Sequence, residues 1–332
     1  MYKKIILIIF FLLPFSLFAT SQKELANIYS RYLKAGMYIQ QDKIIEALRE
    51  LKEIKKLDPK SSHIHLKIAL LMVKLGDFDN AEKEFKMVKK ISPNNLEASL
   101  GLIFLYSYLD RKVELENEYG EFLEKAHNVR PEDMRISEYL GQFYFYKKRL
   151  DDAIRIYEAV IKAKPDYFDA KYLLGYFYEE KGDRQKAIQI WKEILEKNPL
   201  HPDTLNSLGY VYAEEGINLD EAEALIKKSL ENAPNNPAYL DSLGWVYFKK
   251  GDYIKAEEYL KKAIESTSDP LIYEHVGDLY IKLNDKEKAL YYYHKGLEIE
   301  PDNSRLKERI DRYGREDRGI EDKSKTDSPI NH

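Results

Sequence analysis

The chain of 332 residues contains no cysteine, and this absence excludes several kinds of chemistry. Disulfides, a nucleophilic thiolate and cysteine-bound zinc are all ruled out. Glycine-rich phosphate loops, a nucleophile elbow and an HExxH zinc motif are also missing from the sequence. The sequence therefore predicts a protein that is not an enzyme and that has no cofactor.

Histidine and excess charge of one sign are scarce as well. Of the seven histidines, His63 and His65 are only two residues apart, which places them on different faces of a helix and argues against a metal site. The 53 basic and 57 acidic residues leave a net charge of -4, so the chain has no general attraction to nucleic acid phosphates. The fraction of hydrophobic residues, 44%, is typical of a folded protein. The histidine spacing and the net charge together predict that neither a metal nor a nucleic acid is its ligand.

One apolar run is present at the N-terminus, where Lys3 and Lys4 precede the 15 residues 5–19. A basic start, a short apolar stretch and small residues before Gln22 are typical of a secretory signal peptide, here residues 1–21. We therefore expect export to the periplasm or cell envelope. The alternative is an uncleaved anchor, which would be the chain's one membrane contact. The run is shorter than the roughly 20 residues of a usual membrane span, and Pro14 interrupts it.

A repeat of about 34 residues fills most of the remaining chain. Position 8 of the repeat is small in seven of eight copies, position 11 is tyrosine in seven, and position 20 is alanine in seven. The first residues of the eight copies are Ile28, Ser62, Leu96, Met134, Phe168, Pro202, Pro237 and Pro270. Positions 4, 7, 8 and 11 lie on one stripe of a helix, as a packing face requires.

The pattern resembles the tetratricopeptide repeat, with its L-G-x2-Y, A-x3-F and P signature, although the family's tryptophan at position 4 is missing. Residues 205–222 and 240–247 resemble bacterial members of this superfamily. The resemblance implies an all-α, right-handed superhelical solenoid of about eight helix-turn-helix repeats. The predicted segments are repeats at 28–61, 62–95, 96–133 (degenerate), 134–167, 168–201, 202–236, 237–269 and 270–303, a capping helix at 304–313, and a disordered tail at 314–332.

The connections within the repeats also follow from residue types. Gly76, Gly182 and Gly251 are expected to close the first helix of their repeats, and the aspartate that follows each one can cap the second helix. The third repeat is four residues longer than its neighbours, which we interpret as a longer turn.

The resemblance implies an inner groove lined by positions 2, 5, 9, 12 and 13 of each first helix; we call these the inner-face positions. From residue 134 onward they hold nine acids and three bases, a net charge of -6. The asparagine and basic residues with which chaperone-binding members grip a C-terminal carboxylate are missing. The candidate groove residues are Phe104, Tyr146, Tyr172, Tyr176, Glu179, Tyr210, Asp241, Trp245, Phe248 and Asp278.

These residues predict a scaffold or adaptor that binds a protein segment with apolar side chains and net positive charge. Two alternatives stay open. The aromatic residues can instead serve packing between neighbouring helices, since tyrosine is abundant throughout the chain. Aromatic rings beside carboxylates also suit a glycan or cell-wall ligand, whose binding would respond little to salt.

Overall fold

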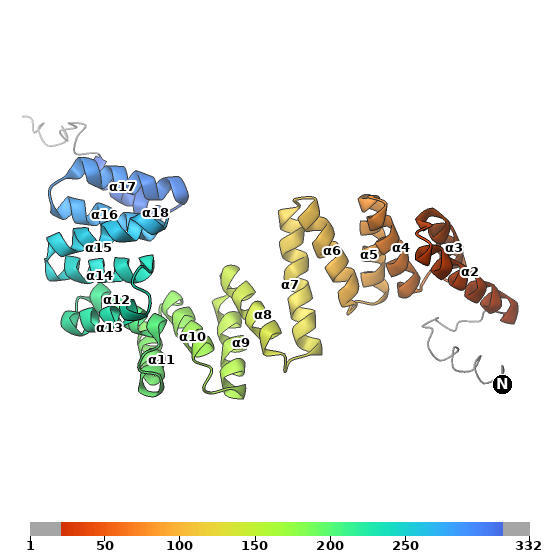
Figure 1. Ribbon diagram of the computed structural model, residues 1–332, viewed down its shortest axis with the longest axis horizontal. Helices are drawn as coiled ribbons and strands as arrows, with labels where there is room; N and C mark the ends of the chain where they lie inside the picture. Colours follow the sequence, from red (N-terminus) through yellow and green to blue (C-terminus); the bar gives the residue numbers. More distant parts are fainter. Residues whose placement is uncertain (1–20, 315–332) are drawn as a thin grey trace, which may run out of the picture. The chain divides into compact units, whose positions relative to one another are not determined.

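The computed structural model describes residues 21–314, and these residues form seventeen helices and no strand. The expected all-α class is confirmed. The chain divides into two compact units, residues 1–156 and 157–332, with the boundary inside one helix (Figure 1). The predicted signal peptide, apart from Ser21, and the tail beyond Gly314 lie outside the described residues. No helix in the described part combines the length and apolar character of a membrane span.

The helices alternate as first and second members of successive hairpins. Their bounds are α2 Gln22–Gln40, α3 Ile44–Leu57, α4 Ser62–Lys74, α5 Phe78–Ile91, α6 Leu96–Tyr108, α7 Lys112–Val129, α8 Met134–Tyr146, α9 Leu150–Ala163, α10 Phe168–Glu180, α11 Arg184–Lys197, α12 Pro202–Glu215, α13 Leu219–Asn232, α14 Pro237–Lys250, α15 Tyr253–Ser266, α16 Pro270–Lys282, α17 Lys286–Ile299 and α18 Ser304–Gly314. Helix α2 thus begins six residues before the first copy of the sequence pattern.

Each unit has its own apolar core between the helices of its hairpins. In the first unit, Ala47, Leu51 and Ile54 of α3 are fully buried. Their spacing of four and three residues puts them on one helical face, which packs toward α2 and α4. In the second unit a comparable core runs from α12 to α18 and ends at Leu306, the buried residue of α18. The hairpins therefore depend on packing of amphipathic faces for their stability.

Glycine at position 8 lets the two helices of a hairpin come close together. A Cβ atom at Gly244 would lie 2.7 Å from Cγ of Leu260, and one at Gly209 would lie 2.7 Å from Cγ1 of Ile226. Real Cβ atoms do not approach other atoms this closely, so either substitution forces the hairpin apart.

Gly244→Ala is therefore expected to lower the free energy of unfolding by about 1–3 kcal/mol, the usual cost of overpacking a core. Gly36→Ala is the matched control, because Gly36 also lies inside a helix but has no atom within 4 Å of the new Cβ. The control should raise stability by about 0.5–1 kcal/mol. Urea unfolding measures both, and equal effects of the two variants would contradict the close-packing argument.

The turn inside each hairpin contains a residue in the left-handed conformation. Gly76, Gly182 and Gly251 have positive φ, as expected for turn glycines, and so does Gly216. The other hairpins use residues that carry a side chain, which the sequence did not reveal: Asp42, Asp110, Lys148 and Asn284. Aspartate and asparagine tolerate this conformation better than most residues.

The four additional residues of the third repeat are not in a turn, so that interpretation was wrong. Helix α7 has 18 residues, whereas α5 and α9 have 14 each. Four residues are about one helical turn, so the insertion lengthens the helix and preserves the faces on either side of it. Gly120 on this helix packs against the ring of Phe143 from α8.

The tyrosine at position 11 joins neighbouring repeats through its hydroxyl group. Tyr106 donates a hydrogen bond of 3.1 Å to Glu82 on the second helix of the preceding repeat, and Arg111 stacks over its ring. Burial alone would raise the pKa of Glu82, but hydrogen bonds from Tyr106 and two cations lower it to about 2. The same type of bond recurs in four pairs: Tyr144–Glu124, Tyr178–Glu158, Tyr247–Glu223 and Tyr280–Glu257.

Candidate functional site

In the first unit, the inner-face positions of α6 expose a stripe of large apolar side chains. Leu100, Phe104 and Tyr108 are four residues apart and are 50%, 53% and 65% exposed. This spacing places them one above another on the helix, and the rings of Phe104 and Tyr108 stack. We call these three residues the α6 stripe.

Helix α6 has no polar face on the side opposite to the α6 stripe. Ala98, Leu102 and Leu105 are buried on the opposite side, and Glu97 is the one charged residue among the thirteen. A helix that is apolar all round is normally buried, so an exposed face on it marks an interaction surface. Leu70 of α4 stands at position 9, as Phe104 does on α6, and is half exposed as well.

In the second unit, the inner-face aromatic residues are mostly covered by the protein itself. The Trp245 ring is 6% exposed and stacks on Phe248, at a centroid distance of 4.6 Å, and on His275, at 4.1 Å. The ring of Tyr210 is tilted against that of the same histidine, at a centroid distance of 6.1 Å. These contacts leave no open face of the indole on which a sugar ring or a peptide side chain could stack.

Two of the acidic inner-face residues of the second unit are paired with cations. Asp241 accepts a hydrogen bond of 2.9 Å from Nδ1 of His275, and both side chains are buried. Asp278 binds Arg309 of α18 through two hydrogen bonds of 2.7 Å. Since these cations were not among the inner-face positions, the charge of -6 overstates the field that a partner would meet.

The histidine at the centre of this cluster has a perturbed protonation equilibrium. Burial alone would lower the pKa of His275, but the carboxylate of Asp241 raises it above its ordinary value. Burial raises the pKa of Tyr210, and the neighbouring carboxylates of Glu214 and Asp241 raise it further. The cluster therefore favours the charged form of His275 beside Asp241 and the neutral form of Tyr210.

The predicted site residues thus divide between the two units. Phe104 and Tyr146 belong to the first unit, where both are exposed. In the second unit, the structure brings Tyr210, Asp241 and Trp245 together around His275, and Phe248 stacks on Trp245.

The remaining four predicted residues contact different neighbours. Glu179 pairs with Arg184, Asp278 with Arg309, and Tyr172 packs on the rings of Trp191 and His201. The ring of Tyr176 lies near that of Phe177.

Sequence reasoning missed four residues that define these surfaces. Leu100 and Tyr108 stand at inner-face positions 5 and 13, so the repeat pattern already contained them. His275 and Arg309 both fall at position 6 when the pattern is continued into α18. Position 6 faces the preceding repeat, and this is why these two cations reach the acids one repeat away.

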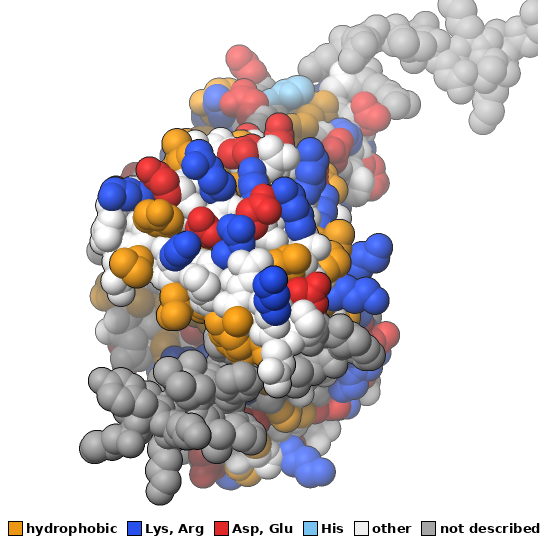
Figure 2. All heavy atoms as spheres, turned by 90° about the vertical axis from the view of Figure 1, so that its right-hand side faces the viewer, with side chains coloured by type: hydrophobic (Ala, Val, Ile, Leu, Met, Phe, Trp, Pro, Cys, Tyr) orange, Lys and Arg blue, Asp and Glu red, His pale blue; other side chains and the backbone are white. Residues whose placement is uncertain are grey.

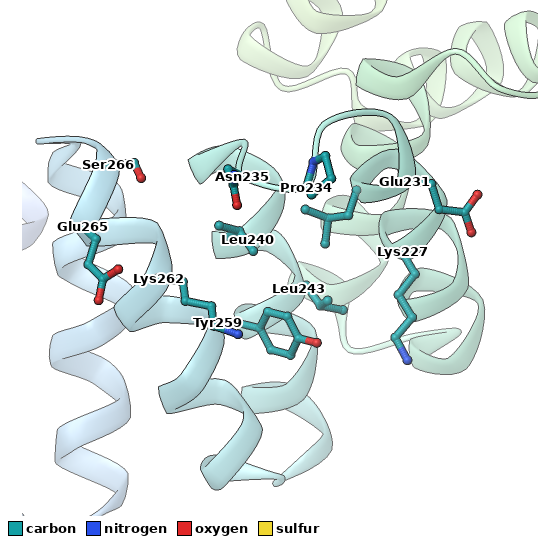
Figure 3. A pocket seen from close by; sticks show the side chains of 11 residues that line it. Lys227, Glu231, Pro234, Asn235, Leu240, Leu243, Tyr259, Lys262, Glu265 and Ser266 are labelled. Atoms are coloured by element: carbon teal, nitrogen blue, oxygen red, sulfur yellow. The ribbon is translucent and has the colours of Figure 1, made fainter.

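A separate hollow of about 580 Å³ lies in the second unit between α13 and α15, beside the start of α14 (Figure 3). Leu240, Leu243 and Tyr259 supply its apolar wall, and Lys227 and Lys262 stand at its edge together with two glutamates. None of the predicted site residues lines it. Its balanced charges favour no particular class of ligand. Within residues 21–314, no group of three or more histidine, aspartate or glutamate side chains is arranged to hold a metal ion.

Comparison with known families decides what kind of protein this is. Four models described as tetratricopeptide repeat match residues 65–95, 116–168, 144–208, 237–269 and 270–303, which together are more than half of the chain. The chain belongs to the tetratricopeptide repeat superfamily. Proteins built from these repeats generally serve as non-enzymatic scaffolds that bind other proteins. No curated protein matches this tetratricopeptide repeat chain in sequence.

One of the similar solved structures supports the fold of this tetratricopeptide repeat protein. The crystal structure of the APC/C hetero-tetramer Cut9-Hcn1 is 17% identical, with a TM-score of 0.53 over 81% of this chain and 52% of that one. A thermophilic TPR protein of Thermus thermophilus is 24% identical, with a TM-score of 0.49, and covers 54% of this chain and 98% of its own. A tetratricopeptide repeat protein of Parabacteroides merdae is 15% identical, with a TM-score of 0.47, over 87% and 99%.

Proposed function

We propose that this tetratricopeptide repeat protein is an exported scaffold of the cell envelope that binds an apolar segment of another protein on the α6 stripe. The observation that carries the proposal is the exposure of Leu100, Phe104 and Tyr108 on a helix with almost no charge. Aromatic and aliphatic anchors of this kind supply contact area at low entropic cost and dominate many protein interfaces. The export of the chain rests on the sequence of residues 1–21.

The second unit carries exposed carboxylates at its inner-face positions. Among its inner-face acids, Asp169 is 81% exposed, and Glu180 and Asp203 are exposed as well. Surface carboxylates attract a basic partner over about a Debye length and raise its association rate. The proposed partner segment therefore combines apolar side chains with net positive charge, and its binding should weaken as salt is added.

The test is the triple variant Leu100→Ala, Phe104→Ala and Tyr108→Ala in the full chain, produced in its own cell. Crosslinked partners are recovered from the envelope fraction and identified by mass spectrometry. We expect a small set of envelope proteins with the unchanged chain and at least a 10-fold lower recovery with the variant. The three side chains are exposed, so the variant should unfold at the same urea concentration as the parent.

The matched control removes two exposed apolar side chains elsewhere, Val113 of α7 and Ile254 of α15. The control variant, with both replaced by alanine, should recover the same proteins as the parent. Equal recovery with the triple variant and the parent would overturn the proposal. A glycan or cell-wall ligand would instead be indicated by retention on purified cell wall that does not change between low and high salt.

A further inference from the structure

The outward face of the first helix, α2, is apolar and has no described element packed against it. Ala26, Ser30, Leu33 and Met37 form one stripe, since they are spaced by four, three and four residues. Leu33 is 68% exposed and Met37 is 57% exposed. We call these four residues the α2 stripe. Figure 2 looks at this end of the first unit, where hydrophobic side chains lie open among Lys and Arg.

The α2 stripe corresponds to the face by which the later repeats pack on the repeat before them. Met37 stands at position 10, whose equivalents in the second, third and sixth repeats, Leu71, Leu105 and Val211, are buried. Ser30 stands at position 3, and its equivalents are likewise mostly buried. The first repeat thus presents a stacking face that has no preceding repeat in the described chain.

The other end of the array is finished differently. Helix α18 buries Leu306 against the last repeat and turns Lys307, Glu308 and Arg312 to solvent. A polar outer face of this kind is what a terminal repeat needs for solubility. The contrast indicates that a binding partner covers the α2 stripe, because an exposed apolar face at one end of the array would otherwise favour aggregation.

The α2 stripe is complementary to itself when two copies of the helix run antiparallel. Residues whose numbers sum to 63 then lie opposite each other, so that Met37 faces Ala26 and Leu33 faces Ser30. Each large side chain meets a small one in both halves of the contact, which is the self-complementarity that a two-fold interface requires. On one flank of the stripe Gln22, Tyr29, Gly36 and Gln40 carry no charge, whereas the other flank carries Lys23 and Lys34, so like charges are absent from one side of the contact only.

From this geometry we infer that two copies of the chain associate through antiparallel packing of their α2 stripes. The occupant of the open face is a second copy of the same protein, and the interface is isologous. Because the α6 stripe lies on a different helix, such a dimer would present two partner-binding surfaces. This inference does not depend on what the α6 stripe binds.

Disulfide trapping tests the register directly, since the chain has no cysteine of its own. Two differently tagged full-length chains, Ala26→Cys and Met37→Cys, are produced together in the native cell and oxidised. We expect a disulfide-linked pair that contains one chain of each kind. Chains with Ala26→Cys alone should not crosslink, because their cysteines would be 11 residues, or about 16 Å, apart along the helices. Absence of the mixed pair, or equally efficient pairing of like chains, would overturn the proposal.

A second measurement separates this contact from other forms of association. The full chain is purified and its mass is measured by light scattering at increasing concentration. The variant Leu33→Glu, Met37→Glu should weaken dimerisation by about 100-fold, because it places two negative charges of each chain, four in all, in the contact. Ile45→Glu, which changes an exposed apolar residue of α3 outside the stripe, should leave the dimer intact. A monomeric parent protein would show that residues 1–20 or another protein occupies the stripe, and would reject the second copy as its occupant.

Discussion

Asp241→Ala is expected to lower the free energy of unfolding of the second unit by about 3–5 kcal/mol, the usual cost of removing one partner from a buried ion pair. Asp241 and His275 are both buried, and each supplies the charge that balances the other. Without the aspartate, the buried ring of His275 that stacks on Trp245 would lose its hydrogen-bond acceptor and the charge that favours its protonated form. Urea unfolding followed by circular dichroism measures the loss.

The same pair predicts a dependence of stability on pH, and its direction follows from the raised pKa of His275. A histidine whose pKa is higher in the folded state stabilises that state fully below its unfolded pKa of about 6.5. The stabilisation is lost as the pH rises through the folded-state pKa. The parent should therefore lose stability as the pH rises above about 6.5, and Asp241→Ala should remove this part of the pH dependence.

Asp169→Ala is the control for this prediction, because Asp169 also contacts a histidine, His201, at 3.2 Å but is largely exposed. An exposed pair of this kind contributes about 1 kcal/mol or less. If Asp241→Ala and Asp169→Ala had equal effects, the buried cluster would not hold the second unit together.

The helical hairpins could be predicted because their determinants are local and repeat eight times. Small residues at position 8, tyrosine at position 11 and the turn glycines each follow from the approach of two neighbouring helices. The turns at Asp42 and Lys148 could not be recognised in the same way, because side-chain residues in the left-handed conformation have no clear sequence signal. The additional turn of α7 was missed because an insertion by itself does not show whether it lengthens a helix or a loop.

The site was harder to predict, since the pattern identifies a position and not its exposure. Trp245 and Phe104 both occupy position 9, yet the first is buried and the second is half exposed. The difference arises because His275, 30 residues after Trp245, covers the indole ring. On α6 the ring of Phe104 is not covered in this way, and the neighbouring Leu100 and Tyr108 are exposed as well. Such contacts between repeats depend on side chains that a periodic pattern treats as equivalent.

Trp191→Ala is expected to have a comparably large effect, about 3–5 kcal/mol, through the loss of a core aromatic side chain. Trp191 is 1% exposed, and its ring fills the space beside Gly175. Its Nε1 group donates a hydrogen bond of 3.3 Å to the carbonyl oxygen of Tyr172. The alanine variant leaves a cavity between α10 and α11 and also leaves that carbonyl group without its side-chain donor.

The set of helices that lose stability distinguishes this prediction from a general destabilisation of the second unit. In a repeat protein each repeat contacts mainly its neighbours, so the loss at Trp191 should be greatest in α10, α11 and α12. Hydrogen exchange should rise in these helices by a larger factor than in α16 and α17. Trp191→Phe keeps most of the ring volume and should show a much smaller change, whereas Tyr291→Ala, on an exposed face of α17, should show almost none. Uniform acceleration along the whole second unit would contradict nearest-neighbour coupling and would mean that the unit unfolds as a single cooperative block.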